Sequence, residues 1–401
     1  MQRRKLLVIG HIFPESRATA AGWRMMKLME SFQQEYDIYF GTAAQRSDNS
    51  DELIHVKEIV SLPLNDDSVN ETLLRIQPDV VIFDRFYTEE MFGWRVAEVL
   101  PNAWRILNSE DLHFVRTTRE HYVKLHKEVA PVDTNQQWDA DATKRELASI
   151  LRCHKTLVIS QWEMNLLEQS FQIPSSKLMF LPLQFPAKTD AVPVERANFC
   201  FIGNGIHKPN ADAIQWLIQT IWPEIQNKLP QAKLNIACGY TSSHLRQLLS
   251  KKKNIQLLER IPDAGEFVQS HLVQLMPVRF GAGIKGKVLE SIVHQTPFVS
   301  TSIAMEGISS DYPFMTDDVE TFVDYAVGLF ISEEQRAKAI DAMNNIQNDY
   351  PDFEKWMEST IDQLRVDAPK DWFAETLLMQ QLNSTKFFSK YITAKNQSLA
   401  D

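Results

Sequence analysis

The sequence predicts an α/β protein built from two consecutive halves, each with a parallel sheet that helices cover on both faces. Strand-like and helix-like segments alternate through most of the 401 residues, which is typical of parallel sheets. The first strand-like run, Lys5–Gly10, is almost entirely apolar, as a strand covered on both faces should be. After the proline-containing stretch Pro182–Val194, the same alternation begins again at Phe199. The chain therefore repeats one architecture.

In the first half, apolar runs predict strands and the 3.6-residue period predicts helices. The strands are expected at 5–10, 36–39, 53–60, 79–83, 104–107, 156–159 and 178–181, and helices after Gly22, after Glu90, from Leu112, before Cys153 and at 161–169. The polar stretch Pro131–Asp141 is interpreted as an insertion or mobile loop. The second half has expected strands at 199–203, 234–238, 255–258, 272–276 and 297–300, and helices after Pro209 and at 284–294, 319–330, 334–348 and 352–366.

These elements divide the chain at the proline-containing stretch, because such segments carry little periodicity. The expected organisation is a first domain over 1–185, a linker over 186–196 and a second domain over 197–350. Residues 351–401 are expected to form helices that pack back on the first domain.

Composition narrows the class of protein. Apolar residues make up 44% and charged residues 23%, as in soluble globular proteins. A formal net charge of −10 argues against a broad nucleic-acid-binding surface, so any anion site is local. Cys153, Cys200 and Cys238 lie far apart in apolar surroundings and are expected to be buried free thiols. No apolar run is long enough to span a membrane, and a cytoplasmic protein is expected.

A glycine-rich stretch, Arg279-Phe-Gly-Ala-Gly-Ile-Lys-Gly-Lys-Val-Leu-Glu290, follows the strand-like run Leu272–Met276. Its glycines allow backbone N–H groups to approach one point at a helix N-terminus, a position that favours an anion. Arg279, Lys285 and Lys287 add positive charge, and Glu290 can accept hydrogen bonds from sugar hydroxyls. The stretch predicts a diphosphate site. The alternative is an ordinary strand-to-helix connection with solvated lysines, since such turns are common.

Polar side chains also follow two strands of the first half. Asp84 and Arg85 follow one strand, and Glu110, Asp111 and His113 follow another. Ligands of open α/β sheets bind beyond the carboxyl ends of the strands, so these groups are expected to line one crevice with the Gly10–Gly22 loop. Alternatively, Glu110 and Asp111 cap the helix that begins at Leu112.

The order of these motifs resembles the group 1 (family 4) glycosyltransferases over residues 5–365. The resemblance rests on Phe201-Ile-Gly-Asn-Gly with Pro209-Asn-Ala-Asp212, and on Arg279–Gly307 with its Leu-Glu-Ser-Ile, Thr-Pro-Phe-Val-Ser-Thr and Glu-Gly segments. It implies the GT-B fold, in which two Rossmann-like domains face each other across an active-site cleft. It also implies sugar transfer from a UDP- or GDP-linked donor, with retention, without a metal or other cofactor. A glycan, lipid-linked or protein acceptor in bacterial cell-surface glycan synthesis is the implied partner.

The resemblance also implies roles for particular positions. Glu290 matches the glutamate that binds the donor ribose, Lys287 a diphosphate-contacting cation, and Gly22 the first-domain glycine loop. The region Ser109–His113 lies where the family carries an acid or histidine near the transferred sugar, and Glu259–Ile261 matches the turn that holds the base. The catalytic candidates are Glu110, Asp111, His113 and Lys287. The donor-binding candidates are Gly22, Gly203, Asn204, Lys208, Gly239, Arg260, Ile261, Arg279, Gly281, Ala282, Gly283, Ile284, Lys285, Lys287 and Glu290.

Two positions depart from the family pattern. Ala282 stands where many members carry a second glutamate, and no arginine follows the first strand of the second domain. Arg279 and Lys285 are expected to supply the missing charge, and a backbone N–H within Gly281–Gly283 to replace the lost carboxylate. These departures motivate one alternative, a nucleotide-sugar-binding partner without catalysis. A nucleotide-sugar epimerase is another, because it shares the architecture.

The last segment, 367–401, lies beyond the resemblance. Trp372, Phe373, Leu377 and Leu378 are expected to pack on the first domain or to meet a partner. Lys386, Lys390 and Lys395 accompany aromatic residues, so a peripheral contact at the inner face of the membrane is the alternative.

Overall fold

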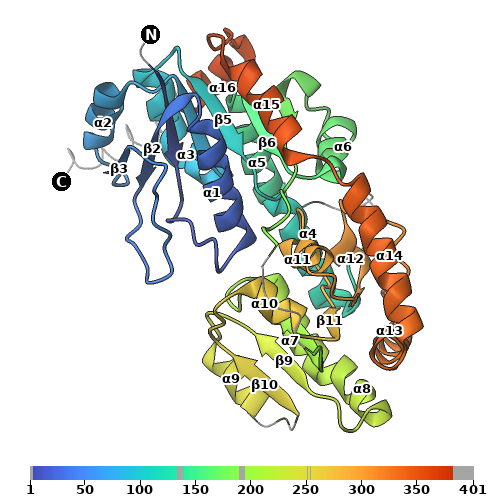
Figure 1. Ribbon diagram of the computed structural model, residues 1–401. Coiled ribbons are helices and arrows are strands. Elements are labelled where there is room, and N and C mark those ends of the chain that lie inside the picture. Colours follow the sequence, from blue (N-terminus) through green and yellow to red (C-terminus); the bar gives the residue numbers. More distant parts are fainter. Residues whose placement is uncertain are drawn as a thin grey trace, which may run out of the picture.

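The computed structural model describes residues 3–132, 138, 140–188, 195–250, 252 and 254–382. It contains two α/β domains, each with a wholly parallel sheet between helices (Figure 1). The first sheet has seven strands in the order β3-β2-β1-β4-β5-β6-β7, and the second has five in the order β10-β9-β8-β11-β12. The strand order reverses between β1 and β4 in the first sheet and between β8 and β11 in the second. Open parallel sheets bind ligands at such a reversal.

The first domain alternates strands and helices as its sequence period predicts. Its elements are β1 (Arg4–Ile9), α1 (Ala20–Phe32), β2 (Tyr36–Thr42), β3 (Glu58–Ser61), α2 (Ser68–Ile76), β4 (Val80–Asp84), α3 (Phe86–Val99), β5 (Trp104–Asn108), α4 (His113–His126), α5 (Ala140–Arg152), β6 (Lys155–Val158), α6 (Gln161–Gln169), the 3₁₀ turn η1 (Ser175–Lys177) and β7 (Leu178–Phe180). Each strand of this sheet is parallel to its neighbours, with Val8 beside both Phe40 and Ile82.

The second domain begins at the next strand. Its elements are β8 (Phe199–Ile202), α7 (Lys208–Trp216), the π-helical turn η2 (Leu217–Ile221), α8 (Trp222–Lys228), β9 (Leu234–Ala237), α9 (Ser243–Ser250), β10 (Ile255–Leu258), α10 (Ala264–Gln269), β11 (Val273–Met276), α11 (Gly286–Val293), β12 (Phe298–Ser300), α12 (Ser302–Met305), α13 (Val319–Ile331) and α14 (Glu333–Asp349). Pro209 lies in the first turn of α7, where its missing N–H carries no penalty.

The chain then returns to the first domain through α15 (Phe353–Leu364) and α16 (Trp372–Leu382). Figure 1 shows both helices beside the first domain, while α13 and α14 flank the second. Phe353, Met357 and Ile361 of α15 are buried in the same apolar cluster as Met25 of α1 and the first sheet. Lys177 forms an ion pair with Asp371 just before α16. Two segments therefore connect the domains, one after β7 and one between α14 and α15.

Some elements differ from the sequence-based expectation. The strand expected over 53–60 is confined to β3, because only Leu53 and Val60 of that run are buried. The polar residues Ser291 and His294, at the end of the glycine-turn helix, are both buried. Ser291 donates its hydroxyl to Gln274, so a polar pair occupies a core position.

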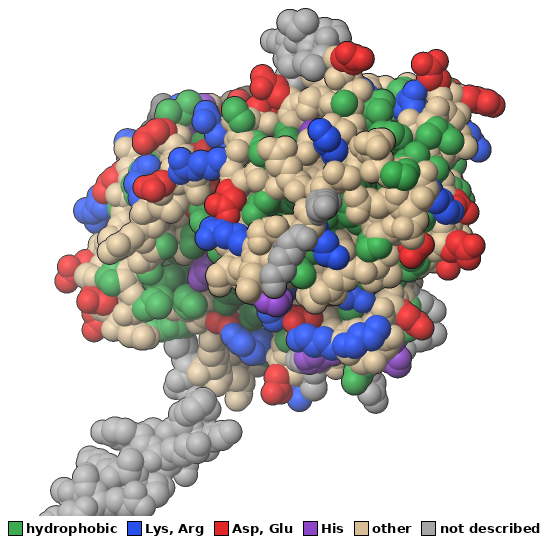
Figure 2. Space-filling model, turned by 90° about the horizontal axis from the view of Figure 1, so that it is seen from below, with side chains coloured by type: hydrophobic (Ala, Val, Ile, Leu, Met, Phe, Trp, Pro, Cys, Tyr) green, Lys and Arg blue, Asp and Glu red, His purple; other side chains and the backbone are tan. Residues whose placement is uncertain are grey.

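The surface and the thiols agree with the composition. On the face shown in Figure 2, basic and acidic side chains are interspersed among apolar ones. Cys153, Cys200 and Cys238 are all buried free thiols, as expected. Within the described part of the chain, no helix combines the length and apolarity needed to cross a bilayer.

Candidate active site

The glycine-rich turn between β11 and α11 lies directly against the first domain. Gly283 has φ +65°, and a Cβ at this position would come within 2.9 Å of the Asp111 Cβ. A Cβ on Gly286 would lie 2.8 Å from the Ala20 Cβ and 3.1 Å from the Trp23 ring. Because real Cβ atoms do not approach so closely, both positions need glycine for the two domains to meet.

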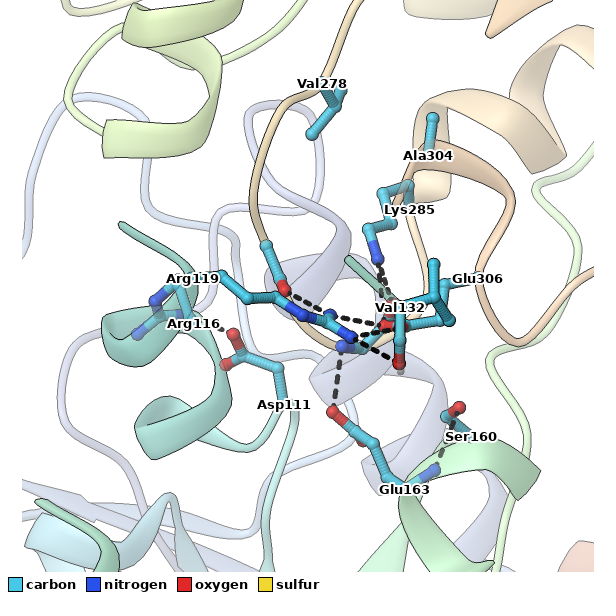
Figure 3. Close-up of polar contacts among 12 residues, drawn as sticks. Asp111, Arg116, Arg119, Val132, Ser160, Glu163, Val278, Lys285, Ala304 and Glu306 are labelled. Atoms are coloured by element: carbon cyan, nitrogen blue, oxygen red, sulfur yellow. Dashed lines mark hydrogen bonds and ion pairs between the residues drawn. The ribbon is translucent and has the colours of Figure 1, made fainter. Parts of the chain in front are cut away.

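A buried carboxylate from the first domain fixes the turn. Oε1 of Glu163, in the first turn of α6, accepts hydrogen bonds from the backbone N–H of Gly283 at 2.9 Å and of Leu112 at 3.0 Å. Figure 3 shows this side chain pointing up from α6 toward the turn. Burial raises the pKa of Glu163 to about 8, and nearby Asp111 adds to the increase. Glu163 thus joins the loop after β5 to the glycine-rich turn.

A second contact between the domains is an ion pair with almost no solvent exposure. Nη1 of Arg119 on α4 lies 2.9 Å from Oε1 of Glu306, and Nη2 lies 2.5 Å from Oε2. Arg119 Nη1 also donates to the carbonyl of Gly281 at 2.8 Å, and its guanidinium stacks on Trp162. Lys285 Nζ is 3.7 Å from Glu306 Oε1 (Figure 3). The turn is therefore fastened to α4 by charge as well as by shape.

Lys287 differs from the other cations near the turn, because it has no acidic partner. Its Nζ donates to Asn210 Oδ1 at 2.8 Å and lies 4.4 Å above the Phe201 ring. None of the carboxylates in the described part of the chain lies within ion-pair distance of it. Burial lowers the pKa of Lys287 to about 7. A partly buried cation without a counter-ion is a site prepared for an anion.

Three other cations named from the sequence, Arg279, Lys285 and Lys208, are already paired. Arg279 forms a two-pronged contact with Asp212, at 2.9 and 2.6 Å, and donates to the carbonyl of Lys127. Lys285 donates to the carbonyl of Gly283 at 2.9 Å. Lys208 is exposed and pairs with Glu120 across the domain boundary, at 3.1 Å. Arg279 and Lys285 were expected to offer positive charge to a ligand beside the turn, but both side chains are engaged by groups of the protein.

Three of the catalytic candidates lie together at the carboxyl end of β5. Glu110 has φ +60°, accepts a hydrogen bond from Asn108 at 2.7 Å and lies 3.7 Å from the buried Arg24. Burial raises the pKa of Glu110 to about 7, although Arg24 opposes the increase. Asp111 pairs with Arg116 and lies 3.3 Å from His113 Nε2. Although burial alone would raise the pKa of Asp111, Arg116 and His113 hold it well below its usual range.

Asp111 does not cap the helix that follows, in contrast to the alternative considered from the sequence. Glu146 of α5 accepts the backbone N–H groups of His113 and Phe114, at 3.1 and 2.9 Å. Burial raises the pKa of Glu146 to about 8. The N-terminus of α4 is therefore capped by carboxylates from α5 and α6, which leaves Asp111 directed to Arg116.

Charged groups from both domains are coupled at this edge. The pKa of His207, in the turn after β8, lies below its usual range because of partial desolvation and the nearby cations Arg116 and Lys287, while Asp111 opposes the shift. Arg85, after β4, also acts on His207. The backbone of Arg85 has φ 72° and ψ 159°. Non-glycine residues seldom adopt this conformation, and such residues cluster at functional sites. His207 of the second domain thus lies near Asp111, Arg116 and Arg85 of the first, and near Lys287 of its own domain.

Glu290 lies on α11, one turn beyond Lys287. It is partly buried, and its Oε1 is 3.6 Å from His294 Nδ1. Burial raises the pKa of Glu290 to about 7, and Asp263 contributes. Arg260 is exposed, and Ile261 packs on the small apolar cluster around Phe267. The structure thus places Glu290 near the start of α10, where Asp263 lies.

The turn after β8 is connected to Lys287 through Asn210. Asn210 Nδ2 donates to the carbonyl of Asn204 at 3.1 Å, while its Oδ1 accepts from Lys287. A Cβ on Gly203 would come within 2.8 Å of Asn210, so Gly203 makes room for this link. The Gly205 N–H donates to the carbonyl of Gly239 at 2.8 Å.

The other glycine-loop positions serve mainly to bring segments together. Gly22 packs against the backbone of Glu15, and a Cβ on Gly22 would lie only 2.5 Å from the Glu15 carbonyl carbon. The Thr19 side chain caps α1 by accepting a hydrogen bond from the Gly22 N–H. Ala282 packs on the apolar core of the first domain, and Ile284 is buried. The expectation that an N–H within Gly281–Gly283 replaces the missing carboxylate meets one obstacle, since the Gly283 N–H is already donated to Glu163.

The two domains also touch at Tyr240, which follows β9 in the second domain. Tyr240, which has φ 55°, donates its hydroxyl to the Glu15 carboxylate at 3.0 Å and accepts a hydrogen bond from Asn49 at 2.6 Å. The Gly10–Gly22 loop is thereby held against the second domain.

Sequence reasoning missed Arg116, Arg119, Glu146, Glu163 and Glu306. Each is a charged residue on or beside a helix. Except for Arg116, which pairs with nearby Asp111, each has a partner far away in the sequence: 162 residues separate Arg119 from Gly281. The Glu-Gly segment after β12 was part of the family pattern, but nothing in the local sequence pairs Glu306 with α4. Only Gly307, with φ +76° and a Cβ position 2.6 Å from Ser160 Oγ, hinted at a close approach.

Comparison with known proteins agrees with this architecture. Residues 196–332 match the family described as glycosyl transferases group 1. An uncharacterized 44.6 kDa protein in the cps region of Klebsiella pneumoniae is 25% identical over 166 residues, which cover 39% of this chain and 42% of that protein. The match thus spans less than half the length of this curated relative.

Solved structures resemble the whole chain at low identity. Sucrose-phosphate synthase from Thermosynechococcus elongatus has a TM-score of 0.64 and 12% identity, covering 90% of this chain and 98% of that one. Anabaena HepE in complex with UDP and glucose has a TM-score of 0.63 and 10% identity, covering 90% and 99%. WaaG, a glycosyltransferase involved in lipopolysaccharide biosynthesis, has a TM-score of 0.60 and 12% identity, covering 90% and 99%.

Together, the domain match and the fold define the class of protein. The chain has the two-domain GT-B fold of glycosyltransferases. Within it, residues 196–332, which match the group 1 glycosyl transferases, contain the glycine-rich turn, Lys287 and Glu290.

Proposed function

We propose that this chain transfers a sugar, with retention, from a nucleotide-sugar donor to an acceptor in bacterial cell-surface glycan synthesis. The observation that carries the proposal is Lys287, a partly buried cation at the N-terminus of α11 with no acidic partner among the described residues. The leaving diphosphate gains negative charge in the transition state, and a cation aimed at it is worth most where water is excluded. The family domain and the cps-region relative support the class of reaction and its setting.

Glu290 is proposed to hold the donor ribose, because its carboxylate lies one turn along α11 from Lys287. Its raised pKa reflects burial without a strong cationic partner, a state that ribose hydroxyls would relieve by donating hydrogen bonds. UDP is the first nucleotide to test, because HepE is similar in fold and its structure contains UDP and glucose. GDP-linked donors are the alternative.

The first domain is proposed to hold the acceptor and to act on the transferred sugar. Asp111 is held ionised by Arg116, whereas burial raises the pKa of neighbouring Glu110 to about 7. Two acids with such different protonation can play different parts at one site. Asp111 would stabilise positive charge on the sugar ring, and His113, whose pKa is lowered chiefly by burial, would accept or donate a hydrogen bond as a neutral ring.

A second candidate function is a nucleotide-sugar-binding partner without catalysis. Ala282 replaces the family glutamate, Arg279 is committed to Asp212, and the Gly283 N–H is committed to Glu163. Each commitment removes a group that would otherwise contact the donor. This candidate retains the Lys287 site and differs only in turnover.

The test is incubation of the purified chain with a panel of nucleotide sugars and cell-envelope glycan acceptors, with nucleotide release and thermal stabilisation measured together. Nucleotide release from one donor, reduced about 100-fold or more by Lys287→Ala and by Glu290→Ala, supports the transferase. Stabilisation without release supports the binding partner, because a ligand that binds only the folded state raises the melting temperature. Absence of binding by every donor rejects both.

The acceptor and the location of the protein follow the same proposal. A glycan, lipid-linked or protein acceptor would approach from the first domain, and a cytoplasmic enzyme would work at the inner face of the membrane. Lys386, Lys390 and Lys395, on which a membrane contact was expected, lie outside the described residues, as do residues 133–137 and 139 of the expected insertion.

A further inference from the structure

Arg85, which follows β4, has one edge of its guanidinium that is open to a ligand. Its Nη1 donates to the Tyr87 hydroxyl at 3.2 Å and lies 3.5 Å from Asp84 Oδ2. Nε and Nη2 have no hydrogen-bond partner among the described residues, and neither atom is sealed from solvent. The side chain is 20% exposed, so a ligand can reach this Nε–Nη2 edge.

The Nε–Nη2 edge of other arginines holds a carboxylate. In four pairs, both nitrogens donate to one acidic side chain: Arg145 with Glu90, Arg152 with Glu89, Arg279 with Asp212 and Arg365 with Glu35. Two parallel N–H groups match the two oxygens of a carboxylate, and the positive charge strengthens both hydrogen bonds. Among the described residues, no carboxylate of the protein occupies this edge of Arg85.

The backbone of Arg85 is strained. Its φ of 72° and ψ of 159° fall in a region that only glycine adopts readily. The Arg85 N–H donates to the carbonyl of Asn108 at 2.8 Å, so the end of β5 fixes this conformation. Strained residues persist where the surrounding structure imposes them, and they cluster at sites that bind ligands. The strain therefore agrees with a binding role for Arg85.

Arg85 also lies where open parallel sheets bind ligands. β1 and β4 are neighbours at the reversal of the first sheet, and ligands bind beyond the strand ends at such a point. His11 follows β1, and its ring packs edge-on to the Tyr87 ring, with centroids 4.7 Å apart. Partial desolvation and the Arg85 charge lower the pKa of His11, and burial raises the pKa of Tyr87. At neutral pH both side chains are therefore uncharged and able to donate a hydrogen bond to a ligand on Arg85.

Neighbouring acids limit the charge of the ligand. Asp84 and Asp111 both lie near the Arg85 guanidinium, and Asp111 already pairs with Arg116. A dianion such as a phosphate monoester would be repelled by both carboxylates. A neutral hydroxyl has one oxygen and would engage only half of the Nε–Nη2 edge. A carboxylate brings a single negative charge and two oxygens in one plane, so it fits best.

We propose that Arg85 binds the carboxylate of an acidic sugar, which belongs either to the acceptor glycan or to the sugar that is transferred. His207 lies near both Arg85 and Lys287, so this carboxylate site is close to the proposed diphosphate site. The inference rests on the proposed function, because that function makes a sugar the ligand. Arg85 then selects acidic sugars over neutral ones.

The experiment uses the full chain and pairs of probes that differ only in the carboxylate. Methyl glucuronide and methyl galacturonide are compared with methyl glucoside and methyl galactoside by saturation-transfer NMR. Saturating UDP occupies the proposed donor site in these samples, so this arm reports the acceptor. UDP-glucuronic acid and UDP-glucose, compared by calorimetry, report the transferred sugar. Glucose 6-phosphate is the dianionic comparison, and hydrogen exchange reports protection of residues 9–13 and 84–88.

Two variants remove the guanidinium in different ways. Arg85→Met keeps a long side chain, whereas Arg85→Gly suits the observed φ and ψ and relieves the backbone strain. Thermal unfolding shows whether each variant folds. The matched control is Arg365→Met, which removes a guanidinium whose Nε–Nη2 edge is already occupied by Glu35, just after α15.

In the unaltered chain and in Arg365→Met, an acidic probe is expected to bind at least about 10-fold more tightly than its neutral counterpart in one of the two arms. Both Arg85 variants should lose this preference, together with the protection of residues 9–13 and 84–88. UDP itself should bind all four proteins with affinities within about 3-fold of one another. A preference among the glycosides assigns the carboxylate to the acceptor, and a preference among the nucleotide sugars assigns it to the transferred sugar.

Binding of UDP with equal affinities for acidic and neutral probes in both arms would overturn the inference and leave the proposed function intact. An acidic preference that survives in both Arg85 variants would also overturn it, as would tighter binding of glucose 6-phosphate than of the uronides. A matching loss of UDP binding in the Arg85 variants would assign Arg85 to the diphosphate instead. Binding of acidic glycosides without binding of any nucleotide would support the carboxylate site but reject the donor site on which the proposed function depends.

Discussion

Arg119 and Glu306 form a two-pronged ion pair across the boundary between the domains, with side chains that are only 0% and 1% exposed. A buried pair of this kind is not strong evidence of added stability, because desolvation offsets much of the attraction. Removing one partner is a different matter, since an uncompensated charge then remains in the interior. The pair therefore specifies how the glycine-rich turn is seated on α4.

The first prediction concerns this pair. Arg119→Met should lower the free energy of unfolding by about 3–5 kcal/mol, because Glu306 loses its two-pronged partner and keeps only Lys285, at 3.7 Å. Arg119→Met combined with Glu306→Leu should recover part of the loss, since no carboxylate is then left without Arg119, although Lys285 loses Glu306. Chemical denaturation of the two single variants and the double variant measures the coupling. Additive losses in the double variant would contradict the pairing. Arg365→Met, which breaks an exposed pair with Glu35, is the control and should cost less than about 1 kcal/mol.

The second prediction separates the two kinds of glycine in the turn. Gly283→Ala should lower the free energy of unfolding by about 1–3 kcal/mol, because Gly283 has φ +65° and an added Cβ would meet Asp111 at 2.9 Å. The matched control is Gly281→Ala, where a Cβ would meet nothing nearer than Lys285 Cε at 3.5 Å. Equal melting temperatures for the two variants would show that the turn does not need the contact with Asp111.

The third prediction concerns pH. Burial raises the pKa of Glu163 to about 8, above its value in the unfolded chain, so the folded state binds this proton more tightly. Its stabilising contribution is therefore complete below a pH of about 4 and is lost as the pH rises through about 8. Urea unfolding between these limits should show a smaller decline for Glu163→Gln than for the unaltered chain. Glu146 shares the same raised pKa, so part of the decline should persist. Parallel curves for the two proteins would count against a protonated Glu163.

Much of the fold could be predicted from the sequence, because the period of apolar residues is a local signal. The parallel sheets, the order of elements and the glycine-rich turn all followed from runs such as Lys5–Gly10 and from the spacing of glycines. The GT-B architecture itself followed from the family resemblance, and the comparisons confirm it.

The site was less predictable, because its electrostatics depend on partners from distant segments. Arg279 and Lys287 are cations of the same motif. Their local sequence does not reveal that Asp212 neutralises Arg279, whereas Lys287 has no acidic partner among the described residues. The capping of α4 by Glu146 and Glu163 was equally hidden, since helix caps are usually sought in the neighbouring sequence. Burial and pairing, rather than residue type, distinguish the cation that can bind an anion.

The last prediction concerns Lys287. Burial lowers its pKa to about 7 in the free protein, so the ammonium form is lost as the pH rises above that value. A diphosphate binds the charged form better and should raise the pKa again, so UDP binding takes up a proton and weakens as the pH rises above about 7. Lys287→Arg keeps its charge throughout and should not show this decline, whereas Lys287→Met should bind about 10- to 100-fold more weakly at a pH of about 6. Calorimetry in buffers of different ionisation enthalpy measures the proton directly. Any titration of UDP itself is common to all three proteins, so an identical pH profile in Lys287→Arg and the unaltered chain would exclude Lys287 from the diphosphate site.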